Sequence, residues 1–271
     1  MSIKNIFNLD GRVAVITGGA GLLGKQHALA IHAFGGIPVL ADINVGAAKR
    51  AAIEVGPRAT AVKLDVTDPQ SVLRARNTVV RRFGRIDILI NNAARDPKVG
   101  AGGITDPGRF EDLDLLSWNL DLAVGLTGAA LCSRYFGEVM AERKKGTILN
   151  IASDLALIGP NQSLYEKRGI PASAQPKKPA SYSVVKSGLL GLTRYLATYW
   201  ASQNVRVNAL CPGGVLKDQP EEFLDRIAKL VPLSRMANLD EYQGAVVFLC
   251  SDASSYMTGS VVAIDGGRTC W

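Results

Sequence analysis

Short β-branched runs alternate with amphipathic stretches of helical period along this chain, and this feature most constrains how it can fold. Near-continuous apolar strands separated by helices are typical of a parallel sheet that is covered on both faces. The pattern therefore predicts an α/β fold, a doubly wound parallel sheet of about seven strands with helices on both sides. The expected strands are Arg12–Thr17, Ile37–Ala41, Ala59–Leu64, Ile86–Ile90, Thr147–Ile151, Val205–Leu210 and Val261–Ile264, and the clearest helices are Gly24–Phe34, Pro69–Phe83, Leu116–Arg143 and Tyr182–Ser202.

A single domain is expected over residues 1–271, because no repeat, linker or low-complexity tract interrupts the alternation. One stretch departs from it. Residues 158–180 read IGPNQSLYEKRGIPASAQPKKPA, which is rich in proline and polar residues and has no clear period. A loop this long inside a compact domain is usually functional or mobile.

The composition excludes several classes of protein. No apolar run approaches the roughly 20 residues of a membrane span, and the first residues lack a secretory apolar region, so a cytoplasmic protein is expected. The four cysteines are scattered and the two histidines are five apart, so we expect no metal site. The net charge of +7 indicates either a solvated basic surface or attraction for an anionic substrate. Nucleic acid is not expected as a partner, because no basic block is interleaved with aromatic residues.

A glycine-rich turn, Thr17–Gly24, joins the first expected strand to the first helix. Glycines let the backbone turn tightly and approach a pyrophosphate, and the helix that follows offers free N–H groups and a positive dipole end. A glycine run alone is weak evidence, but its place between strand and helix favours a dinucleotide site. The expected contacts are Gly18, Gly21, Leu22, Leu23 and Gly24.

Asp42 ends the second expected strand, where a carboxylate can accept hydrogen bonds from the ribose hydroxyls and repel a 2′-phosphate. Since the next residue is Ile43 rather than Arg or Lys, we expect NAD rather than NADP. Two later strand ends point to the same crevice. Asp65 and Val66 are expected beside the adenine, and Asn92 and Ala93 along the cofactor.

Tyr182 and Lys186 lie four residues apart on an expected helix, so both project from one face. A nearby ammonium stabilises phenolate and lowers the pKa of a tyrosine, which makes it usable as an acid or base. Ser153 follows the expected strand Thr147–Ile151, where its hydroxyl can bind the reacting oxygen. A Tyr-x3-Lys pair alone usually marks a solvated helix face, but with the serine and the glycine turn it predicts a catalytic trio.

These motifs, together with NNAA at 91–94, CPGG at 211–214 and the MTG…DGG segment at 257–267, resemble the short-chain dehydrogenase/reductase family over roughly residues 8–267. The resemblance implies a Rossmann-type domain of the single-domain branch, with Tyr182 exchanging a proton, Lys186 binding the nicotinamide ribose and Ser153 orienting the substrate. It also implies that Pro212, Gly213 and Val215 lie near the nicotinamide. Family members are commonly homotetramers or homodimers, with the long fourth and fifth helices and the last strand at interfaces.

Four features depart from the family pattern. The glycine turn reads TGxxGxxG, a spacing more typical of the longer, sugar-nucleotide-modifying branch. Gly125 stands where the family usually has an asparagine that holds a proton-relay water. Lys217 replaces a threonine after the Pro-Gly segment, and Ser153 and Tyr182 are 29 residues apart, which is longer than in compact members.

The extra length is the loop at 158–180, which must border the substrate pocket because it lies between two expected catalytic residues. Its cations and Arg95 indicate an anionic substrate or, equally, ordinary solvation of a surface loop. These cations are Lys167, Arg168, Lys177 and Lys178. With the GRTCW ending, the features are similar to a bacterial subgroup linked to surface-sugar biosynthesis, which implies a sugar phosphate or amino-sugar substrate.

The leading hypothesis is thus an oxidoreductase that interconverts a secondary hydroxyl and a ketone. A 3-oxoacyl-type reductase is an alternative, although Asp42 argues against it because such reductases generally prefer the phosphorylated cofactor. A second alternative is a non-catalytic NAD-binding module, which the loss of the asparagine at Gly125 favours and the retained trio opposes. Trp271 packs either on its own subunit or on a neighbour, and the sequence leaves both open.

Overall fold

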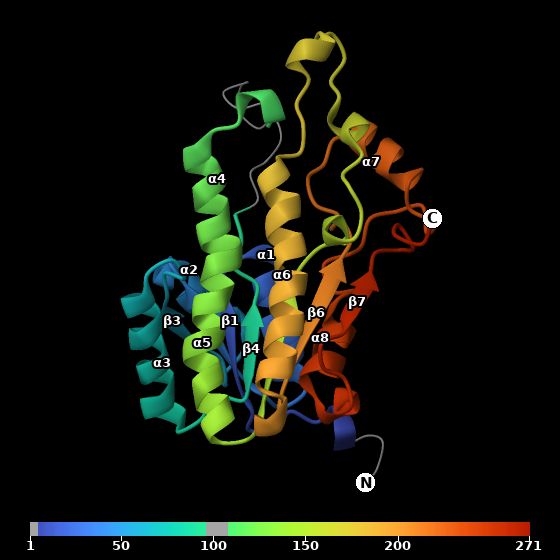
Figure 1. Ribbon diagram of the computed structural model, residues 1–271. Helices are drawn as coiled ribbons and strands as arrows, with labels where there is room; N and C mark the ends of the chain where they lie inside the picture. Colours follow the sequence, from blue (N-terminus) through green and yellow to red (C-terminus); the bar gives the residue numbers. More distant parts are fainter. Residues whose placement is uncertain (1–4, 96–107) are drawn as a thin grey trace.

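The computed structural model describes residues 5–95 and 108–271. Seven parallel strands form one sheet in the order β3-β2-β1-β4-β5-β6-β7, which confirms the predicted fold class (Figure 1). The strands are β1 (Val13–Thr17), β2 (Ile37–Asp42), β3 (Thr60–Lys63), β4 (Ile88–Asn91), β5 (Gly146–Ile151), β6 (Val205–Pro212) and β7 (Val261–Ile264). The order reverses between β1 and β4, and a crevice opens at such a switch point outside the carboxyl ends of the strands.

Helices cover both faces of the sheet, and the alternation of side chains along β1 shows why. Val13 and Val15 point into a core with α3 (Pro69–Phe83), α5 (Gly128–Glu142) and α6 (Ala180–Tyr199). Ala14 and Ile16 point into the opposite core, with α1 (Leu22–Ala33), α2 (Val45–Val55) and α8 (Gln243–Cys250). Because both faces of β1 are apolar, the strand can lie only in the middle of a layered fold.

The predicted helix Leu116–Arg143 is divided in the structure. It runs as α4 (Leu115–Leu122), a π-helical turn over Ala123–Thr127, and α5. By length and composition alone this run is apolar enough to cross a membrane, a property that core and interface helices share. The α5 part packs on β4, β5 and α3, whereas α4 extends beyond the sheet and exposes Leu115, Leu116 and Leu120.

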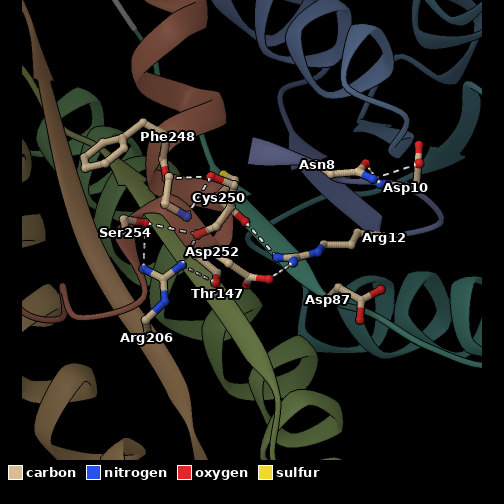
Figure 2. A network of polar contacts seen from close by, with 12 residues as sticks. Asn8, Asp10, Arg12, Asp87, Thr147, Arg206, Phe248, Cys250, Asp252 and Ser254 are labelled. Carbon is tan, nitrogen blue, oxygen red and sulfur yellow. Dashed lines mark hydrogen bonds and ion pairs between the residues drawn. The ribbon is translucent and has the colours of Figure 1, made fainter. Parts of the chain in front are cut away.

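A half-buried arginine joins elements at the amino-terminal edge of the sheet (Figure 2). Arg206 Nη2 donates to Thr147 Oγ1 at 3.1 Å and to the carbonyl oxygens of Leu249 at 3.3 Å and Ser251 at 2.9 Å. Its Nη1 donates to Ser254 Oγ at 3.0 Å and to Met257 O at 3.2 Å. One guanidinium thus ties β5 and β6 to the end of α8 and the segment that precedes β7.

Candidate active site at the carboxyl edge of the sheet

The glycine turn lies where β1 meets α1, and its geometry requires glycine at two positions. Gly18 has φ +62°, and a Cβ on it would come within 3.0 Å of Ala93 Cα. A Cβ on Gly24 would collide with Gly18 O, so only glycine lets α1 begin this close to the turn. Asn92 Nδ2 braces the turn by donating to Thr17 O at 3.0 Å and Gly18 O at 3.2 Å.

The first turn of α1 fits a phosphate group. Its N-cap is Gly21, which has no side chain to occupy the first N–H groups of the helix. The backbone N–H groups of Leu22 and Leu23 lie in that first turn, where an α-helix offers no internal acceptor. Uncapped N–H groups and the positive end of a helix dipole are what a pyrophosphate needs.

The acidic residues at the ends of β2 and β3 lie beside this turn. Asp42 Oδ2 accepts from Ala20 N at 3.1 Å and Oδ1 accepts from Asn44 N at 2.9 Å, so the carboxylate is fixed at the rim. Asp65 Oδ1 accepts from the backbone and the hydroxyl of Thr67, at 2.9 and 2.7 Å. Val66 is buried, and Ala93 N donates to Thr17 Oγ1 at 3.0 Å. The predicted cofactor residues thus line one edge of the sheet.

The predicted trio meets at the end of β5. Lys186 is buried on α6, and its Nζ donates to Ile151 O at 2.8 Å, two residues before Ser153. The Nζ atom lies 5.8 Å from the centre of the Tyr182 ring. Tyr182 is half-buried, so its phenol stays accessible while the ammonium below it is shielded. This is the arrangement in which a buried cation favours the phenolate form of an accessible tyrosine.

Ser153 is bound to a buried carboxylate, itself paired with an arginine, that sequence reasoning missed. Its hydroxyl donates to Asp154 Oδ1 at 2.8 Å, and Asp154 Oδ2 forms an ion pair with Arg268 Nη1 at 2.7 Å. Both charged side chains are almost fully buried. The position of Asp154 next to the candidate serine could have indicated this contact. Nothing in the sequence, however, pairs Asp154 with an arginine 114 residues away.

Gly125 is buried in the π-helical turn and faces α6. A Cβ at this position would come within 2.5 Å of Val185 Cγ1, and Val185 immediately precedes Lys186. An asparagine therefore does not fit here unless Val185 moves. The glycine lets the helical run α4–α5 pack closely against the helix that carries Tyr182.

The loop at 158–180 contains short 3₁₀ turns and is held by a contact within itself and by contacts with α7. The Gln162 side chain accepts from Lys178 N at 2.8 Å and donates to Lys178 O at 3.4 Å. Arg226 on α7 (Glu221–Ala228) donates to Glu166 O at 2.6 Å, and Leu164 is buried against Ile227. These contacts place Lys178 Nζ 3.9 Å from the centre of the Tyr182 ring.

The other cations predicted to attract an anion are differently placed. Arg95 pairs with the buried Asp121 at 3.1 Å, and Arg168 pairs with Glu222 at 3.4 Å. Lys217 lies 3.8 Å from Asp218. Lys178 is therefore the predicted loop cation that the structure holds against the candidate acid/base.

The segment after β6 closes the other side of the edge. Pro212 ends the strand, Gly213 N donates to Ile264 O at 2.9 Å, and Gly213 O accepts from Tyr242 Oη at 2.9 Å. Val215 forms a bridge with Ala237. The predicted nicotinamide-side residues thus lie between β6 and β7, across the edge from the glycine turn.

Solved structures of similar architecture cover the whole chain. A short-chain type dehydrogenase/reductase from Mycobacterium marinum superposes with a TM-score of 0.85 and 29% identity over 100% of both chains. A gluconate 5-dehydrogenase from Burkholderia cenocepacia, in complex with NADP and tartrate, has a TM-score of 0.86 and 26% identity over 100% of both chains.

Sequence comparisons identify relatives of the same kind. The family model described as enoyl-(acyl carrier protein) reductase matches residues 19–269. The cis-4-hydroxycyclohexanecarboxylate dehydrogenase of Sinomonas cyclohexanicum is 33% identical over 95% of this chain and 96% of its own length. The chain belongs to the short-chain dehydrogenase/reductase family. Two further members are D-threitol dehydrogenase of Mycolicibacterium smegmatis, 33% identical over 99% and 97%, and a 3-oxoacyl-[acyl-carrier-protein] reductase of Synechocystis, 32% identical over 96% and 97%.

Membership confirms the predicted family and the oxidoreductase class, and short-chain dehydrogenases/reductases use a nicotinamide cofactor. The predicted link to surface-sugar biosynthesis, the preference for NAD and the residue roles stay predictions.

The sequence predicts only that the two histidines do not bind a metal, and one of them is buried near the cofactor edge. His27 on α1 is fully buried, and neither ring nitrogen has a hydrogen-bond partner among the described residues. Burial lowers the pKa of His27 to about 4, an effect that the nearby Asn92 side chain partly opposes. The imidazole is therefore neutral in the folded protein at pH 7.

This burial makes the stability depend on pH. Between pH 6.5 and 4 the unfolded chain binds a proton at His27 that the folded chain does not, so stability falls as the pH is lowered. A pKa difference of about 2.5 units corresponds to about 3 kcal/mol. We expect urea unfolding of the wild type to lose about that much more between pH 7 and pH 4 than His27→Leu does. Parallel losses in both proteins would contradict the assignment.

Proposed function

We propose that this protein is an NAD-dependent dehydrogenase that interconverts a secondary hydroxyl and a ketone on a sugar phosphate or another small anionic substrate, with amino sugars as a further class to be tested. The observation that carries the proposal is the pair of ammonium groups at Tyr182, Lys186 at 5.8 Å and Lys178 at 3.9 Å from the ring centre. In this proposal Lys186 serves the proton chemistry, and Lys178 binds an anionic group of the substrate.

In this proposal Tyr182 exchanges a proton with the substrate oxygen as a general acid or base. Lys186, held by Ile151 O, keeps the phenol easy to deprotonate. Ser153 fixes the position of the oxygen that reacts. The nicotinamide cofactor accepts or supplies the hydride. It would be held by the uncapped first turn of α1, the Asp42 carboxylate and the segment after β6.

The names of the relatives support an alcohol substrate with a negative charge or several hydroxyls. One acts on a hydroxycyclohexanecarboxylate and another on threitol, and the structural neighbour is a gluconate dehydrogenase. Lys178 gives a physical basis for the charge, because a cation fixed by backbone contacts loses little freedom when it binds an anion.

The test of this substrate class is turnover with NAD⁺ of a panel containing sugar phosphates, amino sugars, cis-4-hydroxycyclohexanecarboxylate, D-threitol and cyclohexanol. We expect the anionic compounds to be preferred. Lys178→Met should raise KM for them about tenfold and leave KM for neutral alcohols within about twofold, since one charge-assisted contact contributes about 1.5 kcal/mol. The exposed Lys49→Met is the matched control. Turnover of neutral compounds alone would refute the anionic class.

The cofactor preference is tested at Asp42. Asp42 Oδ2 bonds the glycine turn, Oδ1 bonds Asn44 N, and the neighbouring Ile43 is exposed, so a 2′-phosphate would meet a negative charge and no cation from that residue. We expect kcat/KM to favour NAD⁺ over NADP⁺ by about 100-fold and Asp42→Asn to reduce this ratio by about tenfold. Asp225→Asn, exposed on α7, should leave it unchanged. The structural neighbour from Burkholderia cenocepacia binds NADP. A wild type that prefers NADP⁺ would overturn the assignment of NAD.

A 3-oxoacyl-type reductase is the second candidate, favoured by the description of the matching family model and by the Synechocystis relative. Acetoacetyl thioesters reduced faster than any ketose or keto acid would favour this candidate. A chain that binds NAD tightly but whose Tyr182→Phe variant matches the wild type in every assay would be a non-catalytic module.

We also infer a homodimer or homotetramer. The exposed leucines of α4 (Leu115, Leu116 and Leu120) form an apolar face on a helix that projects from the sheet, and such a face is normally covered. Sedimentation velocity measures the assembly directly, and a monomer at micromolar concentration would refute it.

A further inference from the structure

The Asp154–Arg268 ion pair is the charged pair beside the candidate active site whose side chains are both nearly inaccessible to water, at 4% and 9% exposure. It is no surface contact. Burying two charges is costly, and such pairs are retained where their geometry or their charge matters. Asp154 follows Ser153 directly in the chain and accepts a hydrogen bond from its hydroxyl, so the pair adjoins the candidate serine.

Asp154 fixes the Ser153 hydroxyl. Ser153 Oγ donates to Asp154 Oδ1 at 2.8 Å, and Leu155 N donates to both, to Ser153 Oγ at 3.2 Å and Asp154 Oδ1 at 2.8 Å. The hydroxyl is therefore held by two partners, and its proton points to the carboxylate. The other carboxylate oxygen, Oδ2, is taken by Arg268.

Arg268 itself is held rigidly by the turn that follows β7. Asp265 Oδ1 accepts from Gly267 N and Oδ2 from Thr269 N, both at 2.9 Å. Gly266 and Gly267 have φ +67° and +88°, and a Cβ on either would come within 3.0 Å of Val231 or Pro232. The guanidinium is thus delivered by a turn that has little freedom to move.

The charge of the pair matters because Tyr182 must ionise nearby. Lys186 Nζ donates to Ile151 O, and Ser153, two residues further on, donates to Asp154 Oδ1, so the candidate lysine and the carboxylate both lie at the end of β5. The Tyr182 ring faces the ammonium groups of Lys178 from the loop and Lys186 from its own helix, and the Asp154–Arg268 pair adjoins Ser153. On the α4 side, Asp121 accepts from Ser181 Oγ, next to Tyr182 in sequence, and pairs with Arg95. An unpaired Asp154 would oppose phenolate formation.

We propose that Arg268 is a positioning residue of this active site, which acts through Asp154 to fix the Ser153 hydroxyl and to cancel a buried negative charge beside Tyr182. The segment after β7 is then part of the catalytic apparatus. The inference rests on the proposed function only in taking Tyr182 as the acid/base.

The test follows the titration of Tyr182 in the full chain, without and with NAD⁺, by NMR of ¹³Cζ-tyrosine assigned with Tyr182→Phe. Arg268→Met leaves Asp154 unpaired and should raise the Tyr182 titration midpoint by about one pH unit. Asp154→Asn leaves Arg268 unpaired and should lower it by a similar amount. The double variant should return close to the wild type, and the exposed Arg74→Met, from the Arg74–Asp68 pair, should not shift it.

Opposite shifts separate this role from a structural one, because a loosened fold would move the midpoint in the same direction in both single variants. No shift, or shifts of the same sign, in folded variants overturns the proposal. If Arg268→Met does not fold, Asp154→Asn alone decides, and an unchanged or raised midpoint overturns it. The titration needs no turnover, so failure to find a substrate and failure of this inference are distinguishable.

Discussion

Replacing Tyr182 by phenylalanine is expected to lower kcat about 10³-fold on any alcohol that the wild type oxidises, with NAD⁺ affinity unchanged within about twofold. In the proposed mechanism the Tyr182 phenol, whose ring lies 3.9 Å from Lys178 Nζ and 5.8 Å from Lys186 Nζ, transfers the proton, and general acid–base catalysis contributes about 10²–10⁴-fold. The ring itself is kept, so the packing of α6 is preserved. Steady-state turnover and NAD⁺ titration measure the two quantities.

Tyr195→Phe is the matched control, because Tyr195 lies on the same helix with its ring exposed. It should leave kcat within about twofold. If Tyr182→Phe also retains its activity, the proton is moved by another group, and the assignment of the trio fails.

Arg206→Met is expected to lower the free energy of unfolding by about 4 kcal/mol. Five acceptors share this half-buried guanidinium, three of them backbone carbonyls, and each acceptor left without its donor costs about 1 kcal/mol (Figure 2). Methionine fills much of the space and offers no donor. Urea unfolding at fixed protein concentration measures the change, since assembly would otherwise shift the result.

Arg82→Met provides the comparison. Arg82 is exposed and donates one hydrogen bond, to Thr60 Oγ1 at 2.9 Å, so its loss should cost at most about 0.5 kcal/mol. Equal effects at Arg82 and Arg206 would mean that the network at the amino-terminal edge contributes nothing special to stability.

The parts of the fold that local chemistry determines were predictable. Apolar strands such as Val13–Thr17 can lie only between two layers. In the turn that follows, Gly24 must be glycine because a Cβ there would collide with Gly18 O, six residues earlier. Strand ends differed by one or two residues, because the side chain of a residue such as Asn91 fits a strand or the turn after it.

What escaped prediction depends on distant residues. The Arg206 network and the Asp154–Arg268 pair join residues far apart in sequence, and several arginines were equally eligible for each. The loop at 158–180 was identified by its composition, yet only its contacts with α7 and Gln162 determine that Lys178, among its four cations, lies against Tyr182. The π-helical turn was unpredictable, since no local rule distinguishes it from continuous helix.

The close approach of Gly125 to Val185 has a consequence for the divergence of this family. An asparagine at 125 and a valine at 185 cannot be accommodated together without a shift of helices, whereas each is compatible with a smaller partner. A lineage that changes from glycine to asparagine at position 125 must therefore first acquire a smaller residue at position 185. A lineage that changes from asparagine to glycine at 125 must do so before it acquires valine at 185. The two positions should vary as a pair among descendants, although neither would contact the substrate in this proposal.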